Sequence, residues 1–365
     1  MIFYCWRKIT LEFRVKIKRS AYCYAGETMI IAQTPFRMSF FGGGTDYEGF
    51  YREHGGAVIS TTFDKYCYTT VRHLPRFFDY SNQITYGIIE RTKTIDEIQH
   101  PAVRNIMKYL DMHELRVVYE ADLPARSGLG TSSSFAVGML NACYALKGKY
   151  ADKRKLADDA IYIERVLCNE AGGIQDQIAA SFGGFNRIDF RDDGYTVTPL
   201  VFSTDRKKDL NNRLMLFFTG FSRFSSDIAK NQVKATKDKT AELLEMKALV
   251  DDVQKLLVSK ADLKEFGKLL DYTWKLKRGI TSDISNNDID ILYKKAIDAG
   301  ATGGKLLGAG GGGFLLFYVE PEYQENVKKA LEDLVYVPFE FENEGTRIMY
   351  FRPEYFDLES VKEGS

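Results

Sequence analysis

"LPARSGLGTSSSFAVGML", residues 123–140, joins a polar, glycine-containing loop to an apolar run that has the length of a helix. Glycine allows a backbone to approach a ligand closely, and the first amides of a helix point outward without partners. Such a segment suits an anion, and phosphate is the anion that it predicts. An ordinary helix with a serine or threonine as its N-cap would show the same residues, so the segment alone leaves both interpretations open.

The neighbouring sequence places this loop between a strand and a helix. Alternation of apolar and polar residues predicts a strand over 115–123, and apolar spacing predicts a helix over about 134–147. Backbone amides between them would bind phosphate oxygens. The side chains of Thr131, Ser132 and Ser133 would offer hydroxyl groups to phosphate or to magnesium.

Two other phosphate motifs do not fit the sequence. The pattern GxxxxGK[ST] is absent, because its nearest approach, at 300–306, has the wrong spacing and no hydroxyl after Lys305. "GAGGGG" at 308–313 matches GxGxxG, but a dinucleotide fingerprint follows a strand and opens a helix. Here we expect the run to follow a helix at 287–299 and to lead into a strand at 314–319. Both a P-loop NTPase and a dinucleotide-binding fold are therefore disfavoured.

Two acidic residues downstream of the loop are candidates for chemistry. On a helix predicted over 152–168, with Asp152 as N-cap, Glu164 falls beside the core-facing stripe and needs a partner. A magnesium ion or a buried arginine would supply it. Asp176 stands among small residues, which leaves its carboxylate the open space that a general base requires. The same position suits an acid in the first turn of a helix, stabilised by the helix dipole.

Composition and charge narrow the class of protein. The chain has 365 residues, 45% of them hydrophobic, which suggests roughly two domains. Fifty basic and fifty acidic residues cancel, so charge favours a small-molecule partner over nucleic acid or a membrane surface. The five cysteines are spread out without a CxxC pair, so no disulfide framework or zinc site is predicted and a cytoplasmic location is expected. No apolar run approaches the roughly 18 residues of a membrane span.

Near residue 205 the sequence changes from mainly strand-like segments to a long charged region whose apolar residues have helical spacing, which predicts a domain boundary there. The charged stretch "STDRKKD" (203–209) is predicted to be a turn. The segment before Met29 lacks a secretory pattern, and we expect it to lie outside the folded unit. The expected parts are an N-terminal extension at 1–28, an N-terminal domain at 29–204, a C-terminal domain at 205–355 and a tail at 356–365. Further strands are predicted over 57–72, 184–190, 195–202, 213–220 and 347–353.

Three blocks of sequence together resemble the GHMP kinases, the superfamily of galactokinase, homoserine kinase and mevalonate kinase. They are "TPFRMSFFGGGTDYEGF" (34–50), "PARSGLGTSSS" (124–134) and "KLLGAGGGGFLLF" (305–317). The resemblance runs from Met29 almost to the C-terminus. It implies an α+β, two-domain fold, with an N-terminal domain like domain 2 of ribosomal protein S5 and a ferredoxin-like C-terminal domain. It also implies an ATP-dependent kinase that uses Mg²⁺.

The resemblance assigns roles residue by residue. Ser132 and Glu164 match the magnesium ligands, Asp176 matches the base that faces the acceptor hydroxyl, and Arg37 matches the arginine that steadies it. The ATP-binding loop matches Ser127, Gly128, Leu129, Gly130, Thr131, Ser132 and Ser133. The expected substrate contacts are Gly43, Gly44, Thr45, Asp46, Gly310 and Gly311.

Within this superfamily the "GGGTDY" form, in place of the "IGEHTDY" of galactokinases, is most similar to the bacterial heptose kinases. These phosphorylate the anomeric hydroxyl of D-glycero-D-manno-heptose 7-phosphate in nucleotide-heptose biosynthesis. Such a substrate needs cationic contacts for its 7-phosphate, for which Arg223, Lys277 and Arg278 are candidates. A solvated helix face explains the last two equally well.

Other functions on the same scaffold stay open from sequence. They are a fucokinase-like or galactokinase-like sugar kinase, a non-catalytic sugar sensor, and a decarboxylase of a phosphorylated isoprenoid acid. The expected partners are a sugar phosphate and ATP, with a homodimer as one oligomeric state compatible with the sequence.

Overall fold

The computed structural model of the chain describes residues 28–75, 77–125, 127–220, 225–235 and 238–352. The predicted extension, apart from Thr28, and the predicted tail lie outside these residues, as does Arg223. Among the described residues, no helix is both long enough and apolar enough to cross a membrane.

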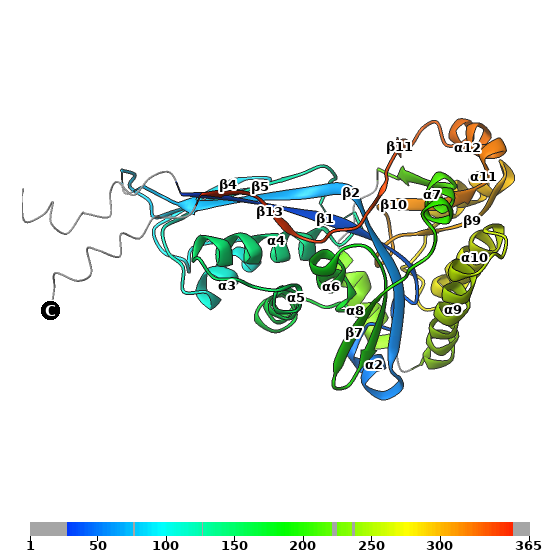
Figure 1. Cartoon of the computed structure of the whole chain (residues 1–365), viewed down its shortest axis with the longest axis horizontal. Coiled ribbons are helices and arrows are strands. Elements are labelled where there is room, and N and C mark those ends of the chain that lie inside the picture. The colour runs from blue at the N-terminus through cyan, green and yellow to red at the C-terminus, as the bar shows by residue number, and fades with distance from the viewer. Residues whose placement is uncertain (1–27, 76, 126, 221–224, 236–237, 353–365) are drawn as a thin grey trace, which may run out of the picture.

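A large sheet runs along the molecule (Figure 1), and nine strands of the described residues form it. Its main path has the order β13-β1-β2-β5-β3-β4, while β12 pairs with β2, and β6 joins β2 to β7. The strands are β1 (Met29–Phe41), β2 (Gly56–His73), β3 (Asn82–Thr85), β4 (Ile89–Thr92), β5 (Leu115–Ala121), β6 (Phe185–Arg191), β7 (Gly194–Pro199), β12 (Phe341–Glu342) and β13 (Arg347–Arg352).

The first two strands shape this sheet. β2 pairs with β6 through residues 56–61 and with β5 through residues 67–73, so one long strand serves two parts of the sheet. β1 pairs with β2 along most of its length, and the register shifts between Pro35 and Phe36, where β2 carries two extra residues. Arg37 is the next residue on β1 and one of the predicted site residues.

Helices cover one face of the large sheet (Figure 1). The central one, α4, is buried along nearly its whole length and packs on β1 and β2. These elements are α3 (Pro101–Tyr109), α4 (Thr131–Leu146), α5 (Lys153–Ile161), the π-helical segment η1 (Tyr162–Leu167) and α6 (Gln175–Phe182), with α2 (Glu48–His54) at the end of β2 nearest β7.

A second sheet of the described residues has four strands in the order β11-β8-β10-β9. Figure 1 shows α9 and α10 beside it, below β9 and β10 in that view. Its strands are β8 (Leu214–Phe218), β9 (Ala301–Leu306), β10 (Phe314–Val319) and β11 (Val335–Val337). The helices of this part are α7 (Thr204–Asn212), α8 (Ser225–Ala235), α9 (Thr240–Val258), α10 (Lys264–Arg278), α11 (Asn287–Asp298), η2 (Pro321–Tyr323) and α12 (Gln324–Ala330).

Two sequence predictions about local structure were wrong. The charged stretch at 203–209 is not a turn but the start of helix α7, because the Ser203 side chain accepts a hydrogen bond from the Arg206 amide and caps it. The glycine run at 308–313 follows strand β9, not a helix. Glycine is depleted in strands, but at Gly303 a Cβ would stand 2.0 Å from the Gly267 carbonyl oxygen, so α10 approaches this strand only because the side chain is absent.

The helix predicted over 152–168 begins as expected, since Asp152 accepts a hydrogen bond from the Lys155 amide at 2.7 Å. It does not continue as one α-helix, because α5 ends at Ile161 and the π-helical segment η1 follows. The Cys168 amide donates to the Ile163 carbonyl, five residues back, at 2.8 Å. Single π-helical turns occur often at functional sites, and this one carries Glu164.

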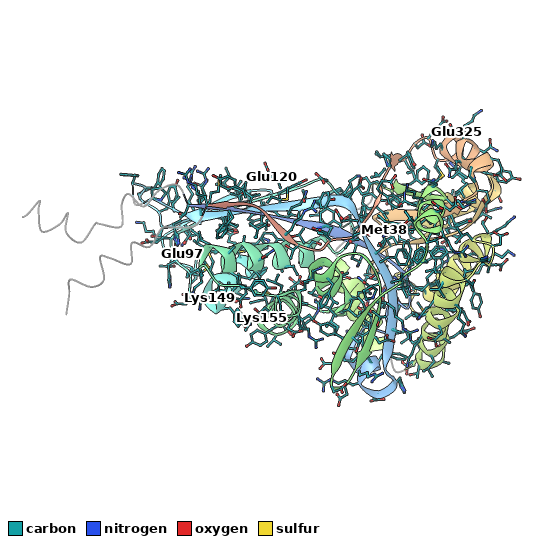
Figure 2. The ribbon with its side chains drawn as sticks, viewed as in Figure 1. Met38, Glu97, Glu120, Lys149, Lys155 and Glu325 are labelled. Carbon is teal, nitrogen blue, oxygen red and sulfur yellow. The ribbon has the colours of Figure 1, made fainter. Side chains whose placement is uncertain are left out.

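The predicted boundary near residue 205 stays a prediction. The end of the described chain returns to the large sheet, where β13 pairs with β1 and β12 pairs with β2. Figure 2 places Met38 of β1 in the middle of the molecule, where the two sheets approach each other. One hydrophobic core includes residues of both sheets, so the two parts share buried surface.

Phe266 of α10 illustrates that shared core, because its ring lies 5.5 Å from Phe40 and 5.1 Å from Phe41 of β1. We expect Phe266→Ala to lower the free energy of unfolding by about 3–5 kcal/mol, since it removes a fully buried ring. Leu244→Ala on neighbouring α9 is the control, because Leu244 is 44% exposed and its loss should cost within about 0.5 kcal/mol. Unfolding in urea measures both, and equal effects would contradict the packing.

Candidate functional site

A cavity of about 190 Å³ lies where the three sequence blocks meet. Residues of β1, of the loops after β1 and β5, of η1 and α6, and of the glycine run line it. Among the predicted site residues, those that line it are Arg37, Gly43, Gly44, Asp46, Gly128, Gly130, Thr131, Ser132, Ser133, Glu164 and Asp176.

The start of α4 forms one wall of the cavity. The helix begins at Thr131, earlier than predicted, and its N-cap is Gly130 in the left-handed conformation (φ 74°), with no side-chain cap. The simple capping role that the sequence left open therefore does not explain the hydroxyl residues. The side chains of Ser132 and Ser133 instead donate to Glu164, at 2.8 and 2.7 Å.

Glu164 is 1% exposed and lies opposite the start of α4. Besides the two serines, the side-chain amide of Gln177 donates to it at 2.5 Å. These donors are neutral, and no arginine or lysine of the described residues forms an ion pair with it, so the buried-arginine alternative is not what this part of the chain shows. A carboxylate beside a serine hydroxyl supplies oxygen ligands of the kind that Mg²⁺ prefers.

The described residues contain no group of three or more histidine, cysteine, aspartate or glutamate side chains that could hold a metal. Magnesium does not need one, because it is commonly bound by one or two protein oxygens together with water and substrate phosphates. Glu164 and Ser132 fit that incomplete type of site.

Asp176 lies in the first turn of α6, as one sequence alternative expected, and it also forms an ion pair. Arg37 donates to both carboxylate oxygens, from Nε at 2.7 Å and from Nη2 at 2.8 Å, which is a bidentate and well-oriented pair. The Asp176 side chain remains 23% exposed toward the cavity. A Cβ at Gly130 would lie 3.4 Å from its carboxylate, so the loop passes directly beside it.

Asp46 is a second carboxylate on the cavity wall, 2% exposed. It accepts hydrogen bonds from the amides of Gly44 at 3.0 Å and Gln175 at 3.3 Å. Burial raises its pKa, and the nearby charge of Asp176 adds to that shift. Thr45, predicted to contact substrate, does not line the cavity, because its hydroxyl is bonded to the carbonyls of residues 42 and 57.

The first residues of the glycine run line the cavity, whereas its middle residues do not. Gly308 and Ala309 line the cavity, whereas Gly310 and Gly311, predicted as substrate contacts, pack against Ile284. Ser127 and Leu129 of the predicted ATP loop are likewise buried away from the cavity wall. Neighbouring residues in a tight loop point in different directions, which a motif comparison cannot resolve.

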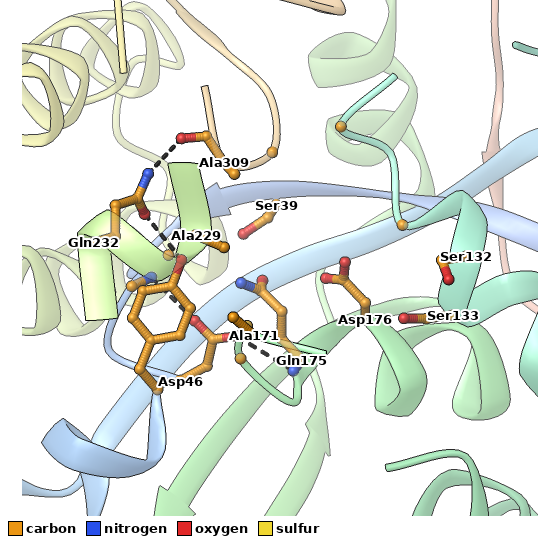
Figure 3. Close-up of a pocket in the computed structure, with 18 of the residues that line it drawn as sticks. Ser39, Asp46, Ser132, Ser133, Ala171, Gln175, Asp176, Ala229, Gln232 and Ala309 are labelled. Carbon is orange, nitrogen blue, oxygen red and sulfur yellow. Dashed lines mark hydrogen bonds between the residues drawn. The ribbon is translucent and has the colours of Figure 1, made fainter. Parts of the chain in front are cut away.

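A chain of hydrogen bonds closes the cavity on the side of α8 (Figure 3). The Tyr47 hydroxyl donates to the Gln232 side chain at 2.9 Å, and the amide of that side chain donates to the Ala309 carbonyl. Residues from three distant parts of the sequence are thereby joined. Spacing in the sequence gave no signal for Gln232, since it lies on an otherwise ordinary amphipathic helix.

Cations that sequence reasoning mostly missed also line the cavity. Lys277 was one of three candidates and is the one found here, whereas Arg278 is partly exposed and pairs with Asp290 at 2.6 Å. Burial, together with the nearby Arg37, lowers the pKa of Lys277 to about 8. Lys305 and Arg165 also line the cavity. Their positions beside the glycine run and directly after Glu164 were the only sequence signals for them.

Comparison of the sequence with known proteins shows that the chain belongs to the GHMP kinases. Profiles described as "GHMP kinases N terminal domain" and "GHMP kinases C terminal" match residues 97–184 and 252–337. A D-glycero-alpha-D-manno-heptose 7-phosphate kinase from Campylobacter jejuni is 31% identical over 335 residues, which are 87% of this chain and 98% of that protein. A galactokinase from Pyrococcus furiosus is 26% identical over 341 residues, covering 83% of this chain and 92% of its own.

Solved structures agree with these matches. A putative sugar kinase from Campylobacter jejuni has a TM-score of 0.64 at 28% identity, covering 88% of this chain and 98% of that one. A D-glycero-D-manno-heptose 1-phosphate kinase from Bacteroides thetaiotaomicron has a TM-score of 0.66 at 24% identity, covering 88% and 99%. The second likeness concerns the fold alone.

The loop before α6 offers a test of the site's packing. A Cβ at Gly173 would stand 1.8 Å from the buried Asp46 carboxylate. The backbone of Gly173 is not left-handed, so this contact is the cost of a side chain there rather than backbone strain. We expect Gly173→Ala to lower the free energy of unfolding by about 1–3 kcal/mol, because the loop or the carboxylate must move. Gly49→Ala is the control, since a Cβ there meets nothing within 4 Å. If denaturant unfolding gives the same value for both variants, Gly173 and Asp46 are not in contact.

Proposed function

Because the chain belongs to the GHMP kinases, we propose that it transfers the γ-phosphoryl group of ATP to the anomeric hydroxyl of a sugar phosphate. The specific substrate that we propose is D-glycero-D-manno-heptose 7-phosphate. The product would be its 1,7-bisphosphate, on a route to nucleotide-heptoses. The relative from Campylobacter jejuni supports this choice of sugar. The observation that carries the chemistry is the bidentate Arg37–Asp176 pair, open to the cavity beside Gly130.

In this proposal the start of α4 and the loop before it bind ATP. Backbone amides of residues 128–133 face the phosphates, as the first amides of a helix favour anions. Glu164 and the Ser132 hydroxyl would hold Mg²⁺, which neutralises negative charge on the phosphate oxygens when bound. Ser133 and Gln177 would keep the carboxylate of Glu164 in place, since both donate to it in the structure.

Asp176 would orient the acceptor hydroxyl and take its proton. The part of Asp176 that is exposed faces the cavity, and Arg37 holds both of its oxygens in a fixed direction. A general base has to lie within hydrogen-bond reach of the proton that it removes. The sugar would lie against Asp46, whose carboxylate accepts hydrogen bonds that sugar hydroxyls donate readily.

The proposed setting of the reaction follows the sequence expectations. We place the protein in the cytoplasm, the compartment favoured by five spread cysteines without a CxxC pair. A homodimer stays a prediction from sequence, and the proposed chemistry does not depend on it.

The proposed base is tested by Asp176→Asn. We expect turnover to fall by at least about a hundredfold, within the usual range for a general base, while ATP still binds with an unchanged Kd. Asp192→Asn is the matched control, because that side chain is 70% exposed and pairs with Arg52 at the surface. Steady-state ADP release and nucleotide titration measure the two quantities. Near-normal turnover in Asp176→Asn would remove the base from the proposal.

The substrate is tested by measuring ADP release over a panel of sugars and sugar phosphates. We expect D-glycero-D-manno-heptose 7-phosphate to give the highest kcat/KM and phosphorus NMR to show a new anomeric phosphate. Fucose and galactose test the two related kinase activities, with mevalonate and homoserine as controls for other members of the superfamily. A higher kcat/KM for any of these would refute the heptose assignment. Sugar binding without ADP release would indicate a sensor, and CO₂ release a decarboxylase.

A further inference from the structure

Two buried lysines line the cavity. Lys277 of α10 is 5% exposed and Lys305 of β9 is 1% exposed, and both line the cavity. The Lys277 ammonium donates to the Gly308 carbonyl, and the Lys305 ammonium donates to the carbonyls of Ser39 and Phe40, both at 2.8 Å. Within the described residues neither lysine forms an ion pair with a carboxylate. We call Lys277, Lys305, Ser39 and Gly43 the lysine corner.

The hydrogen bonds of the lysine corner are incomplete. An ammonium group has three N–H donors, so two remain on Lys277 and one on Lys305 within the described part of the chain. The Ser39 hydroxyl lines the same cavity, is 5% exposed and has no hydrogen-bond partner there. Buried polar groups are rarely left without partners, and buried charges are usually paired. An acceptor that carries negative charge would supply these missing hydrogen bonds and pair with the lysine charge.

There is room for such a group beside the serine. A Cβ at Gly43 would meet only the Ser39 hydroxyl, at 3.6 Å, and the Gln175 amide nitrogen, at 3.9 Å. The chain thus has no side chain at this point of the cavity wall. The side-chain oxygen of Gln175 also lacks a partner among the described residues, and it can accept from a hydroxyl of the same ligand.

Ser39 of the lysine corner, and Gln175 beside it, lie on the acceptor side of the proposed transfer site. In Figure 3, Ser39 and Gln175 lie to one side of Asp176, and Ser132 and Ser133 lie to the other. The nucleotide phosphates are assigned to the serine side. An anion bound beside Ser39 would therefore belong to the second substrate.

We propose that the lysine corner binds the phosphate group that the sugar substrate already carries, and that Lys277 is the residue that selects a sugar phosphate over a free sugar. This inference rests on the proposed function, because it assigns the distal end of the same substrate. Lys305 and the Ser39 hydroxyl complete the contacts. Phosphate provides the acceptor oxygens and the negative charge that the corner lacks.

Arg165 is the rival cation, since it also lines the cavity. Its guanidinium donates to the carbonyls of Glu170 at 3.1 Å and Gly173 at 3.2 Å, and it is only half-buried. The lysine corner is favoured because charge, an unpartnered donor and open space occur there together.

The test measures a ratio, namely kcat/KM for heptose 7-phosphate divided by kcat/KM for unphosphorylated heptose. In Lys277→Met we expect this ratio to fall at least about tenfold, the effect of losing a charge-assisted hydrogen bond, while KM for ATP stays unchanged. Lys275→Met is the matched control on the same helix, because its side chain is 66% exposed and pairs with Asp271. It should leave the ratio as in the wild type.

The pH dependence gives a second readout. The pKa of Lys277 is lowered to about 8, so the free enzyme carries the charge below that pH and loses it above. The groups that act on it are Arg37, Lys305, Asp46 and Asp176. We expect kcat/KM for the sugar phosphate to fall above about pH 8, and Lys277→Arg to shift that fall to higher pH because arginine stays protonated. The unphosphorylated sugar should not show the difference between the two enzymes.

Specific results would overturn the assignment. They are an unchanged ratio in Lys277→Met, a collapse of the ratio in Arg165→Met instead, or a rise in KM for ATP with the ratio intact. If Lys277→Met does not fold, Ser39→Ala replaces it, where a several-fold fall of the ratio supports the corner and an unchanged ratio refutes it. If the wild-type enzyme phosphorylates no sugar phosphate, the proposed function fails; if it does and the ratio resists these changes, only the lysine corner fails.

Discussion

Arg37 holds together the three segments on which the cavity depends. Its side chain binds both oxygens of Asp176 on α6 and donates to the Gly128 carbonyl at 2.8 Å, while its backbone amide donates to the Leu129 carbonyl at 3.2 Å. One residue of β1 therefore fixes the loop before α4 and the carboxylate opposite it. Replacing its planar, five-donor group by lysine would lose that geometry even though the charge remained.

The second constraint is the contact between two glycine segments that are far apart in the sequence. A Cβ at Gly128 would stand 2.5 Å from the Leu307 carbonyl, and a Cβ at Gly308 would stand 2.4 Å from the Gly128 Cα. At Gly313 a Cβ would lie 2.2 Å from the Ser127 carbonyl. Both loops use left-handed backbone, which glycine adopts at little cost. The smallness of these residues brings the glycine run of the second sheet against the loop of the first, and the cavity forms where they meet.

Much of this arrangement could be predicted from the sequence. Comparison confirmed the family and its α+β, two-domain fold, and Glu164 is buried as its spacing indicated. Periodicity located α4 and α11 and strands of both sheets such as β2, β8 and β10, but it missed α7, which buries few apolar residues, and the glycine-containing strand β9. Periodicity could not predict that Ser39 and Lys305 line the cavity. Their position there depends on contacts between strands that are far apart in the sequence, such as the hydrogen bond from Lys305 to the Ser39 carbonyl. Within the glycine run, the structure places Gly308 rather than Gly310 at the cavity wall, while the substrate contacts predicted for Gly310 and Gly311 stay predictions.

The proposed function requires nucleotide phosphates and a magnesium ion to occupy the space between the start of α4 and Glu164. A crystal structure with Mg²⁺ and a nonhydrolysable ATP analogue tests it most directly. We expect the metal at about 2.1 Å from a Glu164 carboxylate oxygen and from the Ser132 hydroxyl, with the phosphates against the amides of residues 128–133. Phosphates bound outside this cavity, or a metal bound away from Glu164, would contradict it.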